Sequence, residues 1–244
     1  MKQCFYTIQS NEPLTNTVYE MRLSGDTSAF SRPGQFLNIR LDGLFLRRPI
    51  SVCDYNKTGL TILYKVVGKG TAQLARMQPG ETLDVLTGLG NGYDTAKSGD
   101  YALLLGGGVG VPPLYGLCKA LIAEGKHVSV VLGFNTKAEV FYEAEFRALG
   151  ADVTVTTVDG SYGKKGFVTD AIPVQYDYFF SCGPEPMLKA VYQATKTSGQ
   201  LSFEERMGCG FGACMGCSCK TLTGYKRICK DGPVLEKEEI LWES

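Results

Sequence analysis

Two patterns of hydrophobic and polar positions divide the chain near residue 99. Before it, short segments that alternate apolar and polar side chains are separated by turns, as in half-buried strands. After it, continuous apolar runs typical of strands buried on both faces are separated by helical segments. The clearest strands of the first part are 18–23, 35–40 and 60–67. Many short strands with regular turns predict an antiparallel barrel over residues 1–98.

Residues 99–200 have the element order of a doubly wound parallel sheet. The predicted strands are 101–105, 127–133, 152–156 and 176–181. The predicted helices are 113–124, 137–149 and a third that follows residue 183 and ends near 196. Buried strands that alternate with helices are typical of a parallel sheet with helices on its faces. The fold class is therefore α/β plus a β-barrel, and the remaining residues 201–244 form a small third domain.

Composition narrows the class of protein. The 244 residues contain 44% hydrophobic residues, as in globular proteins, and 25 basic residues balance 25 acidic ones. This balance gives no electrostatic reason to bind nucleic acid or an anionic membrane. No apolar run approaches the ~20 residues of a membrane span, and the polar start does not resemble a signal peptide. With nine cysteines, we expect a reduced, cytoplasmic protein that binds neither membrane nor nucleic acid.

The third part is dominated by cysteine. Five of the nine cysteines lie within 21 residues, at positions 209, 214, 217, 219 and 229. The first three have the C-x4-C-x2-C spacing that binds a [2Fe–2S] cluster in plant-type ferredoxins. Glycines at 208, 210, 212 and 216 allow the backbone to approach cluster sulfurs closely. The pattern predicts an iron–sulfur site.

The fourth ligand is chosen between Cys219 and Cys229. If the chain after Cys217 is extended, Cys219 points to the opposite face, whereas Cys229 precedes a turn at 231–233 that can close the site. We predict Cys209, Cys214, Cys217 and Cys229 as ligands and Cys219 as a buried bystander. A four-cysteine zinc site remains an alternative, although zinc sites usually pair one C-x2–4-C with another. A Rieske centre needs two histidines, and the chain has only His127.

Two segments of the predicted barrel carry phosphate-binding features. The run 47–51 begins with two arginines, whose guanidinium groups together form a fork that suits a pyrophosphate, and Pro49 is expected to fix a turn after them. The turn 68–71 is rich in glycine and leads into a helix at 72–77, so its free N–H groups favour an anion. Taken alone, each feature is as readily a solvated arginine pair or a tight turn.

A glycine run joins the first strand of the α/β part to its first helix. Gly107, Gly108 and Gly110 stand where a dinucleotide pyrophosphate binds, although Pro113 replaces the third glycine of the usual motif. The last strand ends at Cys182 and Gly183; alone, Cys182 is as well explained as a small buried thiol. The end of the second strand, 133–135, has neither an acidic residue nor an arginine to choose between NAD and NADP.

Together these motifs resemble the ferredoxin reductase superfamily. The run 48–51 is similar to its R-P-x-S flavin motif, 70–71 to its phosphate-binding turn, 106–113 to its GGGxGxxP nicotinamide motif, and 182–187 to its C-G-P-x-x-M turn. The resemblance implies that FAD is bound by Arg48, Pro49, Ile50, Ser51, Leu63, Tyr64, Lys65, Gly70 and Thr71. It implies that NAD is bound by Gly107, Gly108, Gly110 and Gly183, and that the catalytic Cys182 lies where nicotinamide meets flavin.

The tail makes the resemblance more specific. The segment 204–217 reads E-x-R-M-x-C-G-x-G-x-C-x-x-C, and 229–234 reads C-x-D-G-P-V. Both are similar to the electron-transfer subunits of B-type dihydroorotate dehydrogenases, in pyrimidine biosynthesis. That family implies a partner, an FMN-containing catalytic subunit that oxidises dihydroorotate, with two copies of each chain. Electrons then pass through the [2Fe–2S] cluster and FAD to NAD⁺.

Two other functions remain open from the residues. One is an NAD(P)H–flavin–iron–sulfur reductase subunit of another complex, such as a sulfide dehydrogenase, a ferredoxin:NADP oxidoreductase or a hydrogenase. The other is a nucleotide-binding or interaction module in which a zinc ion holds the cysteine segment together. The metal content and colour of the purified protein would distinguish it. No Ser/His/Asp set or pair of carboxylates stands out, so we expect the organic substrate to be oxidised on the partner chain.

Overall fold

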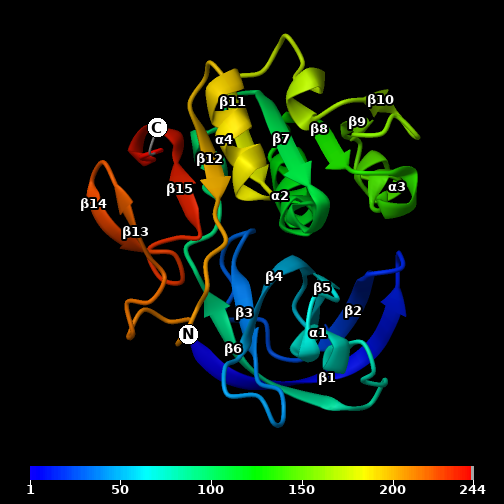
Figure 1. Ribbon diagram of the computed structural model, residues 1–244, viewed down its shortest axis with the longest axis vertical. Helices are drawn as coiled ribbons and strands as arrows, with labels where there is room; N and C mark the ends of the chain where they lie inside the picture. The colour runs from blue at the N-terminus through cyan, green and yellow to red at the C-terminus, as the bar shows by residue number, and fades with distance from the viewer. Residues whose placement is uncertain (243–244) are drawn as a thin grey trace.

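A computed structural model describes residues 1–242. A β-barrel forms the lower half in Figure 1 and a sheet flanked by helices forms the upper half. The C-terminal segment lies at the left, alongside both. Among residues 1–242, no helix is long and apolar enough to cross a membrane.

The first half is a closed antiparallel barrel, as predicted. Its strands are β1 (Lys2–Pro13), β2 (Val18–Ser24), β3 (Phe36–Ile39), β4 (Arg48–Tyr55), β5 (Gly59–Lys65) and β6 (Thr82–Leu89). They close in the order β1-β2-β5-β4-β3-β6. Apolar residues at every second position fill the interior, among them Tyr6, Ile8, Met21, Leu23 and Ile62. A short helix, α1 (Lys69–Leu74), follows β5.

The ladder between β4 and β5 is incomplete. Paired residues begin at Val52 and Ile62 and run toward the β4–β5 turn. The first part of β4, 48–51, pairs only with β3 in the described ladders, and the last part of β5, 63–65, pairs only with β2. We call this opening between the two strand edges the β4–β5 split. Pro49 fits here because a proline without an N–H is tolerated on a strand edge; it lies in a strand and not in the turn we expected.

The second half is the predicted parallel sheet. Its order is β10 (Lys164–Lys165), β9 (Asp152–Thr157), β8 (His127–Phe134), β7 (Tyr101–Gly107), β11 (Tyr178–Cys182), β12 (Gly199–Ser202) and β15 (Val234–Glu236). All neighbours are parallel except β15, which runs antiparallel to β12. The α-helices are α2 (Pro112–Ala123), α3 (Glu143–Ala148) and α4 (Glu185–Ala194).

Helices cover both faces of this sheet. Leu104 and Val130 pack in the cluster that contains α2 and α3, whereas Leu103 and Leu105 pack in the cluster that contains α4. Neighbouring residues of a strand point to opposite faces, so the continuous apolar run fills both clusters. Short 3-10 turns complete the half: η1 (Thr95–Lys97), η2 (Gly108–Gly110), η3 (Lys137–Glu139), η4 (Val168–Ala171) and, in the tail, η5 (Lys237–Glu239).

The helix predicted at 137–149 is wrong in its first half. The structure has the turn η3, a break, and then only α3. Tyr142 ends the break with φ of 67°. Its ring is buried against Tyr115, and its hydroxyl donates to Glu20 of the barrel at 2.7 Å. These tertiary contacts outweigh the local helical preference that the periodicity measured.

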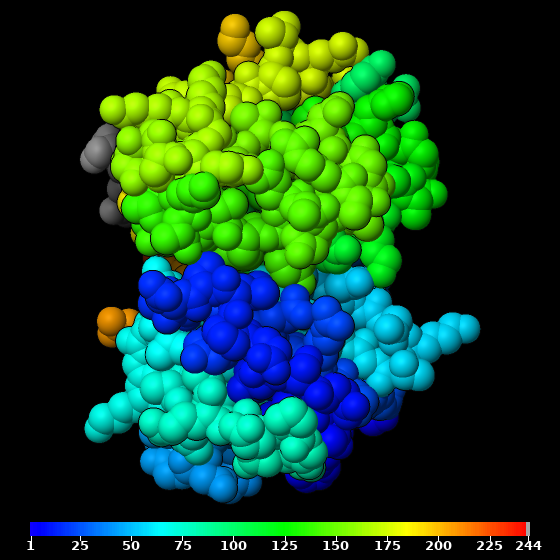
Figure 2. Space-filling model, turned by 90° about the vertical axis from the view of Figure 1, so that its right-hand side faces the viewer, coloured from blue at the N-terminus to red at the C-terminus, as the bar shows by residue number. Residues whose placement is uncertain are grey.

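Helix α2 joins the two halves. Gly116 lies so close to β4 that a Cβ there would be 2.7 Å from the carbonyl oxygen of Cys53. Lys119 forms an ion pair of 2.8 Å with Asp54. Figure 2 shows the barrel in blue and cyan directly against the green half that contains the parallel sheet. The helix that starts at the glycine run is therefore seated on the strand that carries Arg48 to Ser51.

The C-terminal segment begins inside the parallel sheet, because the expected boundary between residues 200 and 201 falls within β12. A hairpin of β13 (Ser218–Thr221) and β14 (Gly224–Arg227) follows the cysteine-rich loop. The chain then returns to the sheet as β15.

Candidate functional site

The four predicted cysteine ligands lie in two pairs. The backbone N–H of Cys209 donates to Sγ of Cys214, and that of Cys214 donates to Sγ of Cys209, each at 3.5 Å. The N–H of Cys229 donates to Sγ of Cys217 at 3.4 Å. Within residues 1–242, no three His, Cys, Asp or Glu side chains are grouped for one metal ion. Two pairs of cysteine sulfurs match a [2Fe–2S] cluster, which takes two protein ligands at each iron.

Backbone N–H groups surround Sγ of Cys209. Ala213 donates to it at 3.2 Å, and Phe211 and Cys214 each do so at 3.5 Å. Partial burial raises the pKa of this thiol, but the N–H donors outweigh it and lower the pKa to about 6. These donors therefore favour the thiolate of Cys209, the form that binds iron. The other pair is buried, and burial with the neighbouring Cys217 raises the pKa of Cys229 to about 12.

The cysteine loop is seated on the barrel. Gly210, with φ of 78°, lies against Asn38 of β3, where a Cβ would be 2.3 Å from Nδ2. Asn38 is buried, and its Nδ2 donates to the carbonyl oxygen of Cys209 at 3.4 Å. Cys214 remains exposed. Cys219 is half-buried against the apolar cluster that contains Cys217 and Cys229. The loop thus has one pair of sulfurs toward the protein and one toward solvent.

The residues predicted to bind FAD line the β4–β5 split. Arg48, Pro49, Ile50 and Ser51 form one edge, and Leu63, Tyr64 and Lys65 form the other. Such edges present backbone N–H and C=O groups that need partners. Gly70 and Thr71 begin α1 at one end of the split, where a Cβ on Gly70 would be 2.5 Å from Nε of Arg48. An arginine against a helix N-terminus suits a pyrophosphate.

The two neighbouring arginines have different surroundings. Arg47 is bound to Asp84 by an ion pair of 2.9 Å and donates to the backbone oxygen of Asp84 at 3.0 Å. Arg48 donates only to carbonyl oxygens of its own loop, and no carboxylate in the described chain forms an ion pair with it. The sequence suggested a fork of both arginines. The structure leaves Arg48 alone to meet an anion.

The three residues of the second edge face different ways. Leu63 is buried in the cluster that extends into the nucleotide-binding half. Tyr64 points into the barrel, stacks on Tyr19, and donates its hydroxyl to Asn11 at 2.7 Å. Lys65 is exposed. The side chain of Tyr64 is thus part of the barrel core, so at the split it offers its backbone.

The glycine run and the turn at 182–183 meet at the switch point of the sheet. β7 continues to β8 on one side, and β11 lies on its other side. Ligands of such sheets bind outside the carboxyl ends of the strands at this point. A Cβ on Gly110 would be 2.3 Å from the carbonyl oxygen of Cys182, and one on Gly107 would be 2.4 Å from Sδ of Met187. Gly108, with φ of 51°, faces open space.

Cys182 is a half-buried, neutral thiol. It lies at the carboxyl end of β11, level with Gly106 on β7 and Ser202 on β12. Burial raises its pKa to about 12, although a hydrogen bond with Ser202 opposes the shift. The described geometry places it beside the glycine run, in keeping with the predicted nicotinamide site, and holds it protonated at neutral pH.

The second strand of the sheet does end near an acidic residue, contrary to our expectation. Turn η3 brings the carboxylate of Glu139 back to Asn135, whose backbone N–H and Nδ2 donate to it at 3.2 and 2.9 Å. The sequence suggested a helix from residue 137, which would have carried Glu139 away from the strand end. An acidic residue four positions beyond an Asn in a turn is the signal that was missed.

Gly110→Ala is expected to impair NAD binding selectively. Its methyl group would collide with backbone at Cys182 and Gly183, which flexible side chains cannot relieve. We expect KM for NAD⁺ to rise at least about tenfold, since displacement of the loop costs over ~1.4 kcal/mol, with FAD and iron content unchanged. Gly125→Ala is the control, because it adds the same methyl group in open space, and its φ of 81° adds a backbone strain that Gly110→Ala lacks. An equal rise in both variants would contradict the contact argument.

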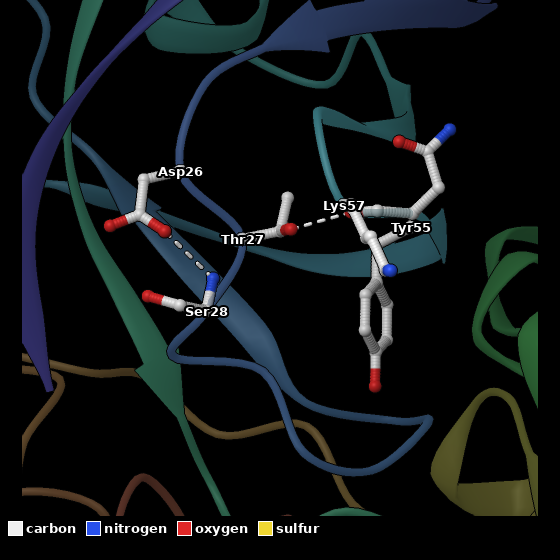
Figure 3. A pocket seen from close by; sticks show the side chains of 6 residues that line it. Asp26, Thr27, Ser28, Tyr55 and Lys57 are labelled. Atoms are coloured by element: carbon white, nitrogen blue, oxygen red, sulfur yellow. Dashed lines mark hydrogen bonds between the residues drawn. The ribbon is translucent and has the colours of Figure 1, made fainter.

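A shallow pocket lies on the barrel away from these sites. Figure 3 shows the loop of Asp26, Thr27 and Ser28 facing Tyr55 and Lys57. It is at the end of β4 opposite Arg48, and none of the predicted site residues lines it.

Comparisons with known proteins agree with this geometry. Residues 204–241 match the iron–sulfur cluster binding domain of dihydroorotate dehydrogenase B, and residues 104–193 match the oxidoreductase NAD-binding domain. The chain is 46% identical over 256 residues to the "Dihydroorotate dehydrogenase B (NAD(+)), electron transfer subunit" of Geobacillus sp. (strain WCH70), with 99% of both chains covered. It is 47% identical to the protein of the same name from Bacillus pumilus (strain SAFR-032), with 98% of both covered.

Solved structures show the same architecture. A structure of an NADH-dependent reduced ferredoxin-NADP oxidoreductase superimposes with a TM-score of 0.88 and 32% identity, covering 97% of this chain and 90% of that one. A ferredoxin NADP⁺ reductase from Neisseria gonorrhoeae, with bound FAD and NADP, superimposes with a TM-score of 0.68 at 18% identity, covering 80% and 90%. The second likeness shows the fold alone.

Proposed function

The chain belongs to the family of dihydroorotate dehydrogenase B electron transfer subunits, and we propose that it carries electrons from dihydroorotate, oxidised on a partner, to NAD⁺. The observation that carries the proposal is the presence of three sites in one chain: the paired cysteines, the β4–β5 split and the switch point of the sheet. Its relatives of the same length are 46–47% identical over at least 98% of both chains.

The chain is an oxidoreductase subunit whose cofactors are FAD, a [2Fe–2S] cluster and NAD. A nicotinamide exchanges two electrons as a hydride, a cluster exchanges one, and a flavin handles both, so the three together convert between the two. In our assignment Cys209, Cys214, Cys217 and Cys229 hold the cluster. Arg48 and the N-terminus of α1 hold the FAD pyrophosphate, and the glycine run holds NAD. We assign no ligand role to Cys219.

We assign NAD as the nucleotide with a specific residue in support. The carboxylate of Glu139 at the end of β8 can accept a hydrogen bond from a ribose hydroxyl and would repel a 2′-phosphate. We assign Cys182 as the catalytic residue among the predicted ones. In this assignment its neutral thiol lies against the nicotinamide at the switch point, where the nicotinamide meets the flavin.

A catalytic partner subunit follows from the family. We propose that it contains FMN, and that two copies of each chain assemble. The docking surface we assign is the outer side of the cysteine loop, where Phe211 and Met215 are 39% and 54% exposed on either side of the exposed Cys214. Phe and Met are enriched at protein interfaces. A partner seated there would cover the solvent-facing pair of sulfurs. We also place the complex in the cytoplasm, supported by the nine cysteines, all within the described residues, none of which forms a disulfide there.

Phe211→Glu is expected to weaken the partner complex about 30-fold or more, since a buried aromatic anchor contributes 2 kcal/mol or more at such interfaces. Dihydroorotate-dependent NADH formation should fall at limiting partner concentration, while reduction of a dye by NADH stays unchanged. Tyr225→Glu is the control, because Tyr225 is 74% exposed on the hairpin beyond the loop. Equal affinity of Phe211→Glu and the unaltered chain for the partner would remove this surface from the assignment.

The runner-up function is a reductase subunit that serves another partner. The likeness to an NADH-dependent reduced ferredoxin-NADP oxidoreductase, at 32% identity, is the observation that favours it. The chain's internal sites would be the same in both functions. Only the partner's substrate distinguishes them, and the higher identity to the dihydroorotate dehydrogenase subunits favours dihydroorotate.

A further inference from the structure

One peptide group connects Cys209 to an arginine behind the loop. The N–H of Ala213 donates to Sγ of Cys209 at 3.2 Å, the shortest of the described donors to that sulfur. The carbonyl of the same peptide, that of Gly212, accepts from Nη1 of Arg227 at 2.9 Å. In a trans peptide the C=O and N–H point in opposite directions. A donor that holds the carbonyl therefore also aims the N–H at the sulfur.

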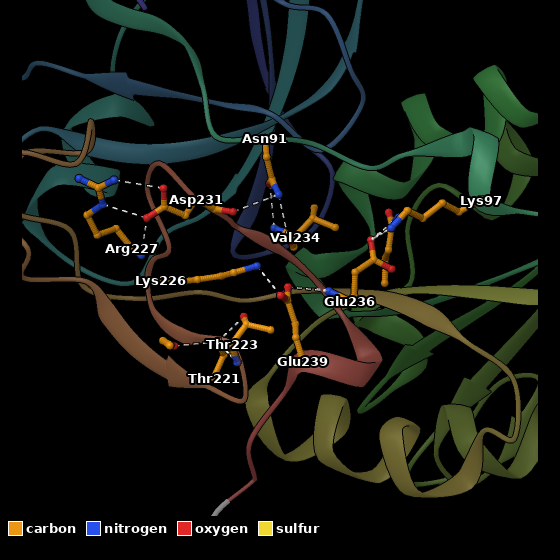
Figure 4. A network of polar contacts seen from close by, with 12 residues as sticks. Asn91, Lys97, Thr221, Thr223, Lys226, Arg227, Asp231, Val234, Glu236 and Glu239 are labelled. Atoms are coloured by element: carbon orange, nitrogen blue, oxygen red, sulfur yellow. Dashed lines mark hydrogen bonds and ion pairs between the residues drawn. The ribbon is translucent and has the colours of Figure 1, made fainter.

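Arg227 is itself held rigidly. Its Nε and Nη2 donate to the two carboxylate oxygens of Asp231 at 2.8 and 3.1 Å, and its backbone N–H donates to Asp231 at 2.9 Å. Figure 4 shows this pair beside the contact of Asn91 with Val234, which fixes the returning chain. A bidentate pair leaves the remaining guanidinium nitrogen, Nη1, with a fixed direction.

We propose that Arg227 is a positioning residue that raises the reduction potential of the cluster by orienting the Gly212–Ala213 peptide toward Cys209. The proposal rests on the assignment of Cys209 as a ligand. Hydrogen bonds to cluster sulfurs set the potential, because an N–H dipole stabilises the additional negative charge of the reduced state. Polarisation of the carbonyl by the guanidinium strengthens the donor on the other side of the peptide.

The proposed role of Arg227 depends on how it orients the Gly212–Ala213 peptide and not on its positive charge alone. The positive charge of Arg227 is matched by Asp231 at close range. A lysine in its place would keep the charge but lacks the planar fork that serves Asp231 and Gly212 at once. Arg227→Lys therefore separates orientation of the peptide from net charge.

The test is an anaerobic redox titration of the purified complex, followed by the EPR signal of the reduced cluster. In Arg227→Lys we expect the ratio of reduced to oxidised cluster at a fixed potential to fall about tenfold, or about 59 mV for one electron. Pulsed EPR after exchange into D₂O should show a weaker coupling to the exchangeable proton near the cluster. Lys226→Arg is the matched control: it also keeps the charge, lies on the same strand, and pairs with Glu239 away from the loop.

The outcomes separate this inference from the function it rests on. A lower midpoint in Arg227→Lys with an unchanged one in Lys226→Arg supports it. Equal midpoints in both variants overturn it, and so does loss of iron from Arg227→Lys alone, which would make Arg227 a residue for cluster retention. If the unaltered chain holds iron and sulfide without a [2Fe–2S] signal, the ligand assignment fails instead.

Discussion

Cys214→Ala is expected to abolish electron transfer from dihydroorotate to NAD⁺ while NADH still reduces a dye through the flavin. Cys214 is the exposed member of the solvent-facing pair, so its loss removes a ligand without opening the core. Loss of a ligand should exceed the ~10–100-fold effect of losing an outer-shell partner. In our assignment FAD is bound at the β4–β5 split and NAD at the switch point, by other residues. The measurement compares both reactions in flavin-loaded protein.

The matched control for this variant is Cys219→Ala. Cys219 belongs to the same segment but is half-buried against apolar side chains. We expect its loss to leave iron content and both activities near those of the unaltered chain. Loss of the dye reaction in flavin-loaded Cys214→Ala would contradict the proposed order of cofactors. Loss of iron in Cys219→Ala would contradict the ligand set.

The second large effect is expected for Arg48→Ala, which should release FAD. The guanidinium lies against Gly70 at the start of α1, and no described carboxylate forms an ion pair with it. Hydrogen bonds to a charged group contribute about 1.5–3 kcal/mol, so affinity for FAD should fall about 10- to 100-fold. Flavin retained after gel filtration, and titration of the apoprotein with FAD, measure the change.

Arg40→Ala is the control for Arg48→Ala. Arg40 is a nearby arginine with a 64% exposed side chain, and its contact with Asp84 is 3.6 Å. The two variants lose the same charge from neighbouring parts of the barrel, since Ile39 beside Arg40 pairs with Arg48. Full retention of FAD by Arg48→Ala, or equal losses in both, would remove Arg48 from the pyrophosphate role.

The barrel and the parallel sheet were predictable because their signals are periodic. The alternation in 18–23 indicates a strand with one buried face, and the apolar run 101–105 indicates a strand buried on both faces. Both strands are present in the structure. Strand β4 was missed because Pro49 suggested a turn. The structure shows instead that Pro49 lies in β4, where the strand pairs with β3 but not with β5. This position depends on the registers of the β3–β4 and β4–β5 ladders, which are not visible in the local sequence.

The cysteine spacing is a local signal, and the family match over residues 204–241 supports it. The phosphate-binding motifs are local signals as well, and their roles stay predictions. What the sequence could not place depends on contacts between distant residues. Nothing local distinguishes Arg47, which pairs with Asp84, from Arg48. Likewise Glu139 reaches the end of β8 only because Tyr142 breaks the expected helix in contact with Glu20. Arg227 lies on β14 and contacts Gly212, 15 positions earlier in the chain.

The central claim is that this chain links a dihydroorotate-oxidising partner to NAD⁺. The most direct measurement mixes the purified chain, loaded with FAD and iron, with its co-purifying partner, dihydroorotate and NAD⁺ without oxygen, and follows NADH absorbance. We predict NADH formation that requires both chains. If NADH bleaches the flavin and cluster but dihydroorotate produces no NADH, the internal sites stand and the assignment of the partner is contradicted.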